Sequence, residues 1–417
     1  MGNVANLRLL LIANAVSQFA QGISMIAIPW YFINQLEDAG LFTILFFVVT
    51  GLTLFWSPYA GSLIDRFHRK KLFITLCVIG ALLLLSIAFT GFYYGETPLV
   101  GIGIIFGFTV LNYNLHYPAL YALAQEMTSK GNSAKTNSLL EIQGQATSML
   151  SGAFAAILIS GIPESFGFIR QYIEIDPWPL HYVFLMDGIT YLIAIAFLLF
   201  LRHQAIHEKN ASEVDLGRVL DRIKLGIQYL KEHPRLFRYG MFSYFVFVTV
   251  IVHMFYIIHA YVSNVLLAMA FTLALSQVFH TVGALSAGFV SRKLFTNKRI
   301  INTKILMIGT ALVYLSFYLF NNKWLFACGC LFIGFANSSI RILRVSYLFD
   351  HVPHLKMGRV ASVFQSGNIL LRLVLIGLFY SSFFQANVQY SYLVMFGFIL
   401  IALLPIWKMR ESKPDSE

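Results

Sequence analysis

Charged residues are scarce in this sequence, and their scarcity argues against a water-soluble protein. Only 12% of the 417 residues are Asp, Glu, Lys or Arg, and 58% are hydrophobic, whereas soluble domains carry about a quarter charged residues. Cysteine is also rare: there are 3, and Cys328 and Cys330 lie inside an apolar run. The cysteines therefore form neither a disulfide framework nor a paired metal motif.

Motifs of the common enzyme classes are missing as well. The sequence has no metalloprotease helix, phosphate-binding loop or nucleophile elbow. We therefore predict a protein that is not an enzyme and has no cofactor. A metal-ion permease is disfavoured, because His116, His253, His259 and His280 do not share a helix face. Hydrogen-bonded cavity walls or proton carriers are the alternatives for these histidines.

What the sequence does contain is a series of apolar runs of about 20 residues, each long enough to cross a hydrocarbon layer of roughly 30 Å. They predict an all-α membrane protein with twelve transmembrane helices. The first run is too long for a signal-peptide core and lacks a small-residue cleavage site, so we expect it to be retained. The predicted spans are 8–34, 40–63, 72–93, 98–126, 134–160, 182–201, 237–262, 264–290, 300–321, 324–349, 358–384 and 389–408, with almost no loop between the seventh and the eighth.

The connections between these spans sort by charge. One alternate set carries Arg66, Arg69, Lys70, Lys71, Lys130, Lys135, the bases of 202–238 and of 292–304, Lys356 and Arg359. The other set is mainly acidic, with Arg170 and Lys323 against Glu37, Asp38, Glu96, Glu164, Glu174 and Asp176. The positive-inside rule then places both termini on the cytoplasmic side. We expect the membrane to be a bacterial-type inner (plasma) membrane. The net charge of +11 is explained by topology, so we expect no nucleic-acid partner.

A polar stretch at 202–236 separates six spans from six others. We predict an N-terminal bundle at 1–201, a cytoplasmic linker at 202–236, and a C-terminal bundle with a short tail at 237–417. Within the linker, Val219, Ile223, Ile227 and Leu230 recur at helical spacing, which indicates an amphipathic helix along the membrane surface. It is either a structural connection or a regulatory element.

The two halves also resemble each other. A shift of 224 residues aligns Glu126 with Asp350 and Lys135 with Arg359, and it also aligns Ser138 with Ser362 and Glu141 with Gln365. Repeats of six spans are typical of transporters built as two bundles around a midplane site.

The segment "GSLIDRFHRKK" at residues 61–71 resembles the signature loop of the major facilitator superfamily. Weaker segments, "NLRLLLIANAVSQFAQGISMIAIPWY", "YPALYALAQEM", "FLMDGITYLIA" and "GRVASVF", look like the drug-proton antiporter branch that contains macrolide-efflux proteins and the enterobactin exporter. The resemblance implies two six-helix bundles, alternating access and a functional monomer. It also implies a small-molecule substrate, protons as the coupling ion, and efflux.

The signature loop has a physical reading of its own. Gly61 permits close helix approach, and Asp65 beside Arg66, Arg69 and Lys70 offers charge-assisted hydrogen bonds. Such a cluster can hold one side of a transporter shut and release as the bundles rock. Simple control of topology by positive charge is the alternative.

Polar side chains also form stripes on several apolar spans, where a polar group facing lipid would be costly. They predict a substrate cavity, although helix–helix hydrogen bonds are the alternative for each single amide. The predicted cavity residues are Asn14, Gln18, Gln21, Asn112, His116, Gln145, His253, Tyr256, Gln277, Asn337, Gln365 and Asn368.

Five charged residues lie inside the predicted spans and at least five residues from their ends. Glu141 is either a proton-coupling group or half of a structural ion pair with Arg341 and Arg344, which lie at a similar depth. Arg372 is an anion site or a partner of Asp187. Asp187 itself is either a helix-start residue or a coupling acid.

Two kinds of cargo fit this scaffold. The first is an amphipathic small molecule such as a drug, exported with proton coupling. The second is a siderophore or a lysophospholipid, moved in either direction. Arg341, Arg344 and Arg372 favour an anionic cargo. Protons and membrane lipid are the other expected partners.

Overall fold

The computed structural model describes residues 2–127, 133–161, 176–201, 219–268, 270–294 and 298–410. All regular structure in these ranges is helical. Twelve helices are long and apolar enough to cross a membrane. The predicted all-α fold with twelve spans is therefore confirmed.

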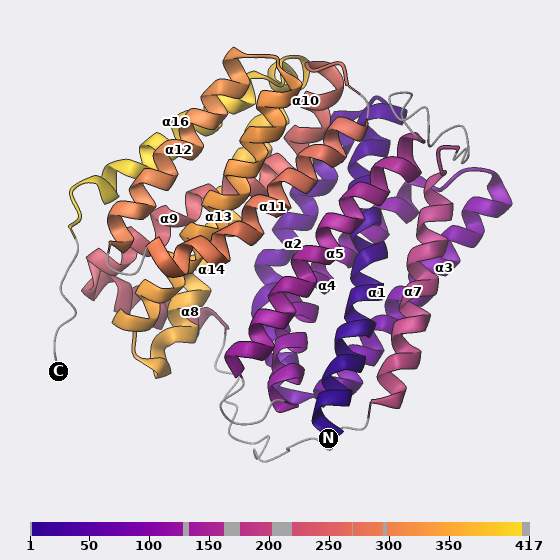
Figure 1. Ribbon diagram of the computed structural model, residues 1–417, viewed down its shortest axis with the longest axis horizontal. Coiled ribbons are helices and arrows are strands. Elements are labelled where there is room, and N and C mark those ends of the chain that lie inside the picture. Colours follow the sequence, from indigo (N-terminus) through magenta and orange to yellow (C-terminus); the bar gives the residue numbers. More distant parts are fainter. Residues whose placement is uncertain are drawn as a thin grey trace. The chain divides into compact units, whose positions relative to one another are not determined.

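The first half of the chain contributes six of these spans (Figure 1). The first helix ends in a π-helical turn, η1. The backbone hydrogen bonds of a π-helix join residues five apart, whereas those of an α-helix join residues four apart. The elements are α1 (Gly2–Trp30), η1 (Tyr31–Gln35), α2 (Ala39–Arg66), α3 (Arg69–Tyr94), α4 (Leu99–Glu126), α5 (Ser133–Ser160) and α7 (Leu180–Phe200).

The second half contributes the other six, preceded by the short helix α8. Its first span also contains a π-helical turn, η3. The elements are α8 (Val219–Glu232), α9 (Pro234–Val252), η3 (His253–Ile257), α10 (Ile258–Asn264), α11 (Ala270–Leu294), α12 (Arg299–Leu319), α13 (Lys323–His351), α14 (His354–Phe379), α15 (Ser382–Ala386) and α16 (Tyr390–Trp407).

Local sequence explains several helix boundaries. Pro234 occupies the first turn of α9, where its missing N–H costs nothing. Asn322 caps α13, because its side-chain oxygen accepts hydrogen bonds from the backbone N–H groups of Trp324 and Leu325 at 2.9 and 3.0 Å. The expectation of almost no loop after the seventh span was wrong: that span ends at Asn264 and α11 begins at Ala270.

The chain divides into two compact units. Unit 1 comprises Met1–Glu37 and Phe55–Leu216, and unit 2 comprises Asp38–Leu54 and Gly217–Glu417. Helix α2 is therefore shared: its first part packs within unit 2, where the Phe42 ring lies 6.5 Å from that of Tyr256. The sequence-based boundary at 202–236 stays a prediction.

Within unit 1, α1 packs against α5 and α7, and α3 against α7. Within unit 2, the closest packing is between α11 and α13. There the helices meet backbone to backbone: a Cβ on Gly283 would collide with the Leu331 carbonyl oxygen, and one on Gly334 with that of His280. Only glycine permits this approach.

The short helix α8 packs on α14 and α9. Gly226 lies against the Arg359 carbonyl oxygen, and the Lys356 ammonium lies 4.6 Å from the centroid of the Tyr229 ring. Burial and then the charge of Glu232 raise the pKa of Tyr229, so the ring stays neutral and attracts Lys356 through its π-face. Of the predicted apolar stripe, Leu230 is buried and Ile227 is exposed, while the side chains of Val219 and Ile223 lie outside the described residues.

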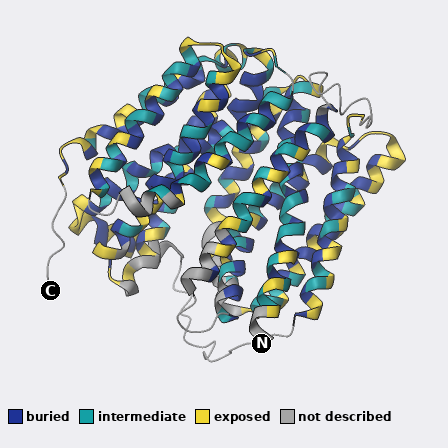
Figure 2. Ribbon diagram, viewed as in Figure 1, coloured by how far each residue is buried: buried dark blue, intermediate teal, exposed yellow. Residues whose placement is uncertain are grey.

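Exposed residues lie along the helices (Figure 2), and many of them have large apolar side chains. Leu82 and Phe89 on α3, Ile305 on α12 and Leu404 on α16 are examples. In water such surfaces would promote aggregation, whereas in a bilayer they contact hydrocarbon.

Candidate functional site

A hydrogen-bonded chain of neutral polar groups joins three helices of unit 1. Asn14 on α1, only 2% exposed, donates to Gln143 Oε1 on α5 at 2.7 Å. Its Oδ1 lies 2.8 Å from His116 Nε2 on α4. The amide of Gln143 continues to Thr147 Oγ1 at 3.2 Å. The structure therefore brings the predicted residues Asn14 and His116 together.

Next along α1, Gln18 Nε2 donates to Gln21 Oε1 at 2.8 Å. The hydroxyl of Tyr117 on α4 donates to Gln18 Oε1 at 3.2 Å. Asn14, Gln18 and Gln21 thus share one polar side of the helix, as their spacing predicted.

Asp187 is the one carboxyl group inside a candidate span among the side chains that the structure describes. It is 1% exposed. Its Oδ2 accepts a hydrogen bond from Ser24 Oγ at 2.7 Å, and its Oδ1 has no hydrogen-bond partner in the described part of the chain. The helix-start alternative was wrong, because α7 begins at Leu180 and Asp187 lies about two turns inside.

Asn112 lies near this carboxyl group. Its amide donates to the hydroxyl of Tyr191 at 3.4 Å, and Tyr191 is close enough to Asp187 to feel its charge. The hydrogen-bond partner of the Asp187 carboxyl group among the described residues is therefore the Ser24 hydroxyl of α1.

Unit 2 presents a different kind of interior. Arg344 on α13 is 3% exposed; its Nη1 donates to the Ser243 carbonyl oxygen at 3.2 Å. Its guanidinium carbon lies 3.5 Å from the centroid of the Tyr244 ring. Among the described side chains it has no carboxylate partner, since the ion pairs found there are Arg69–Glu126 and Arg299–Asp350.

A second arginine lies over α9, the helix that carries Ser243 and Tyr244. Arg372 on α14 donates from Nη2 to Asn368 Oδ1 at 3.4 Å, and its guanidinium carbon lies 6.0 Å from the centroid of the Phe247 ring. Asn368 is fully buried, and its Nδ2 has no hydrogen-bond partner in the described residues.

His253 does not share a face with Tyr256. His253 is fully buried, and its Nδ1 lies 3.1 Å from the Tyr392 hydroxyl on α16. Tyr256 instead contacts α2, where it forms a hydrogen bond with Thr43. Both lie in the π-helical turn η3, whose wider spacing separates residues that an α-helix would align.

Thr249 lies on the same side as His253. Its hydroxyl accepts a hydrogen bond from Tyr314 on α12 at 3.3 Å. The structure therefore places Thr249 and His253 among the aromatic rings packed between α9, α12 and α16.

The remaining predicted cavity residues lie on α5, α11, α13 and α14. Gln145, Gln277, Asn337 and Gln365 are half-buried, and Arg341 is exposed. The side chain of Glu141 lies outside the described residues.

An ion pair joins the start of α3 to the end of α4: Arg69 Nη1 lies 2.8 Å from Glu126 Oε1. Lys70 Nζ donates to the Leu201 carbonyl oxygen at 2.7 Å and so covers the end of α7. Residues 61–66 belong to α2 rather than to a loop. The side chains of Gly61, Asp65 and Arg66 lie outside the described residues.

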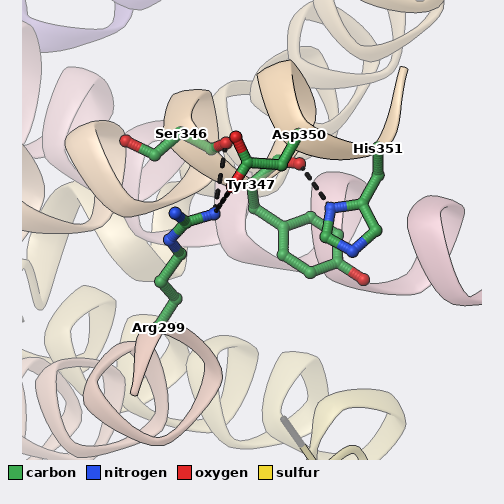
Figure 3. A network of polar contacts seen from close by, with 5 residues as sticks. All are labelled: Arg299, Ser346, Tyr347, Asp350 and His351. Atoms are coloured by element: carbon green, nitrogen blue, oxygen red, sulfur yellow. Dashed lines mark hydrogen bonds and ion pairs between the residues drawn. The ribbon is translucent and has the colours of Figure 1, made fainter. Parts of the chain in front are cut away.

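Unit 2 repeats this arrangement (Figure 3). Arg299, at the start of α12, pairs with Asp350 near the end of α13 and donates to the Ser346 carbonyl oxygen at 3.3 Å. Lys304 Nζ donates to the carbonyl oxygens of Trp407 and Met409 at 2.7 and 2.8 Å.

Sequence reasoning missed several members of both clusters. Gln143 falls between the predicted Glu141 and Gln145, although Thr147 at i+4 offered a signal. Ser24 extends the polar stripe of α1 by about one more turn beyond Gln21. Ser243 acts through its backbone carbonyl, and no side-chain pattern reveals that.

The family model of the Major Facilitator Superfamily matches residues 10–375. The chain belongs to the major facilitator superfamily. It is therefore an integral membrane secondary transporter of small molecules and not an enzyme. No curated protein sequence matches the chain closely enough to place it in a branch of the superfamily.

Solved structures of other superfamily members share the fold. The D-xylose-proton symporter has a TM-score of 0.71 at 13% identity, covering 99% of this chain and 98% of its own. The nucleoside transporter NupG has a TM-score of 0.68 at 13% identity, covering 97% and 100%. A bacterial homolog of the human lysosomal transporter Spinster has a TM-score of 0.69 at 11% identity, covering 98% of each.

Proposed function

We propose that this superfamily member is a proton-coupled exporter of a small amphipathic organic molecule and works by alternating access. The observation that carries the proposal is Asp187, a buried carboxyl group held by the Ser24 hydroxyl. An ionisable residue inside a membrane span is costly and is therefore a candidate for a proton or substrate path.

Asp187 suits proton exchange for a structural reason. One oxygen is fixed by Ser24, while the other has no partner among the described residues. The free oxygen can take a proton without breaking that hydrogen bond. Glu141, on α5, is the second candidate for this role.

The charge pairs at the helix ends suit the gate of such a cycle. Arg69–Glu126 in unit 1 and Arg299–Asp350 in unit 2 each tie the start of one span to the end of the next. We propose that they hold the ends of these spans in register, while Asp65 and its basic neighbours form the latch that opens and closes.

The proposed cargo follows from the chemistry of the spans. Amide stripes with adjacent aromatic rings suit an amphipathic molecule. Movement of a siderophore or a lysophospholipid is the second candidate function, and the arginines of unit 2 favour it.

The test uses the purified chain in liposomes that contain a pH-sensitive dye. Macrolides, catecholate siderophores and lysophospholipids are added in turn under an imposed proton gradient. We expect one class to evoke proton movement, and Asp187→Asn to abolish that movement while downhill exchange of the same compound continues. Asp176→Asn, at an exposed position, is the matched control.

Two results would count against the proposal. Cargo movement without proton movement would remove the coupling, and uphill transport by Asp187→Asn would remove this residue. Glu141→Gln, assayed in parallel, then decides whether the second acid carries the proton.

We also propose that both termini face the cytoplasm of a bacterial-type inner membrane, because the basic connections lie on that side. Ser212→Cys in a Cys328→Ser background should resist a membrane-impermeant maleimide applied to intact cells. Labelling from outside would reverse the orientation.

A further inference from the structure

The spans of unit 2 carry positive charge that their own sequence does not neutralise. Between Glu232 and Glu411 the sequence contains a single acidic residue, Asp350, and Asp350 pairs with Arg299 at the helix ends. The spans around Arg344 and Arg372 thus contain arginine but no carboxylate. Burying a guanidinium group in this way is costly unless something compensates the charge.

The compensation that Arg344 receives is incomplete. One N–H donates to the Ser243 carbonyl oxygen, the Tyr244 ring covers one face, and the side chain of Tyr244 also forms a hydrogen bond with the guanidinium group, but Nε has no partner among the described residues. The positive charge of Arg341 acts on the same group. A guanidinium group offers five N–H donors, so Arg344 retains donors for a further acceptor.

Asn368 adds a second unsatisfied donor. Its side chain is fully buried, its Oδ1 is occupied by Arg372, and its Nδ2 has no partner in the described part of the chain. A buried amide N–H₂ without an acceptor costs about 1–3 kcal/mol.

These donors gather along one helix. Arg344 comes from α13 and lies on Tyr244, whereas Arg372 comes from α14 and lies over Phe247. The two rings belong to α9, and their centroids are 6.4 Å apart. The result is a strip of aromatic surface with a guanidinium group over each ring and a buried amide donor at its edge.

We infer that Arg344, Asn368 and Arg372 bind the anionic head of an amphipathic substrate, a carboxylate, sulfonate or phosphate group. The chemistry is one-sided, because Arg344 Nε and Asn368 Nδ2, which have no partner among the described residues, are donors and the ligand must supply acceptors. Guanidinium groups bind such oxyanions through paired hydrogen bonds. The rings of α9 contact the apolar body of the substrate. This inference rests on the proposed transport function and narrows its cargo to organic anions.

The experiment compares probes that differ in charge. The purified full chain is placed in phosphatidylcholine nanodiscs and titrated with lysophosphatidylglycerol against lysophosphatidylcholine, and with 1-naphthoate against 1-naphthamide. We expect the anion of at least one pair to bind at least tenfold more tightly than its uncharged or zwitterionic partner and to raise Tm.

The variants test the site itself. Arg372→Gln and Asn368→Leu should each weaken binding of the anion at least tenfold. The Tm measured without ligand should stay close to that of the wild type. Arg344→Lys keeps the charge but not the paired donors, so it should weaken binding of the anion less than Arg372→Gln does. Arg238→Gln, an exposed position on α9, should bind like the wild type.

Three outcomes overturn the inference: no anion binds, the uncharged partner binds as tightly, or Arg372→Gln and Asn368→Leu bind the anion unchanged. The proposed function fails differently. Proton-coupled movement of a neutral or cationic cargo would keep that function and remove the anion site. Anion binding without proton movement would do the reverse.

Discussion

The two units bury polar groups in opposite ways. In unit 1, side chains pair with one another: Asn14 bonds to both Gln143 and His116, and Ser24 bonds to Asp187. In unit 2, the buried charge is Arg344, which is held by a backbone carbonyl and an aromatic ring. Unit 2 also has neutral side-chain pairs, such as His253 with Tyr392, so the contrast lies in the buried charged group: an acid in unit 1 and an arginine in unit 2.

The difference matters because each kind of group suits a different ligand. A lone carboxyl group held by a hydroxyl suits a proton, whereas guanidinium groups with spare donors suit an oxyanion. If both proposals hold, the ion-coupling and the cargo-binding functions are divided between two halves that descend from a common pattern. The helix ends, by contrast, carry the same ion pair and the same lysine contact in both halves.

The largest expected effect is on helix packing in unit 2. Gly283→Ala should force α11 and α13 apart, because the new methyl group meets the Leu331 carbonyl oxygen; we expect a loss of about 1–3 kcal/mol or more. Gly22→Ala in unit 1 should cost less, since Ser151 is a side chain that can rotate away. Gly288→Ala, which meets open space on the same helix as Gly283, is the control. Thermal unfolding in nanodiscs measures all three, and equal losses for Gly283 and Gly22 would contradict the backbone contact.

The next effect separates two buried asparagines. Asn14→Leu removes the partner of both Gln143 and His116, so we expect a loss of about 1–3 kcal/mol for each group left unsatisfied. Asn368→Leu should lower Tm less, because the printed hydrogen bond that it removes, from Arg372 Nη2, is long at 3.4 Å and its Nδ2 already has no partner among the described residues. A larger drop in Tm for Asn368→Leu would show that unit 2 uses this amide for stability.

A smaller effect on stability is expected at the two ion pairs. Glu126 is 18% exposed and Asp350 is 50% exposed at the side chain, so Glu126→Gln should slow transport more than Asp350→Asn. The cost to stability should stay below about 1 kcal/mol in both. The exchanged pair Arg69→Glu with Glu126→Arg should recover the transport rate. If the double variant transports no better than the singles, the charges act separately.

The smallest loss of stability is expected at the two lysines that bind helix ends, and it should be similar in both units. Lys70→Met and Lys304→Met each remove an ammonium group from the carbonyl end of a helix, α7 or α16. We expect each to lose about 0.3–1 kcal/mol. Unequal losses in thermal unfolding would show that the helix ends, like the interiors, have diverged.

Sequence alone predicted the fold well, because apolar runs of sufficient length directly indicate membrane-spanning helices. It also placed Asn14, Gln18 and Gln21 on one side of a helix, since a regular helix keeps i, i+4 and i+7 together, but it did not single out the contact of Asn14 with His116. It could not place Ser243, which acts through its carbonyl group. It also could not identify Gln143, because two polar neighbours fitted the assumed periodicity better.

The predicted cavity residues His253 and Tyr256 do not share a helix face, for another physical reason. Their spacing is right for an α-helix, but η3 has a wider turn. His253 therefore packs against Tyr392 while Tyr256 contacts α2. Nothing in the residue types at 253–257 signals the change in pitch.

The π-helical turn at His253–Ile257 has a consequence for insertions and deletions. Such a turn holds one residue more than the α-helix around it, so deleting a single residue there should restore a continuous α-helix. Because the turn absorbs that residue, the residues after the deletion should keep their orientation. Tyr261 should then keep its hydrogen bond to the Phe317 carbonyl oxygen, now 2.6 Å long. A relative without the turn must be aligned with a one-residue gap, whereas a deletion in the regular part of α9 would rotate every later residue by about 100°.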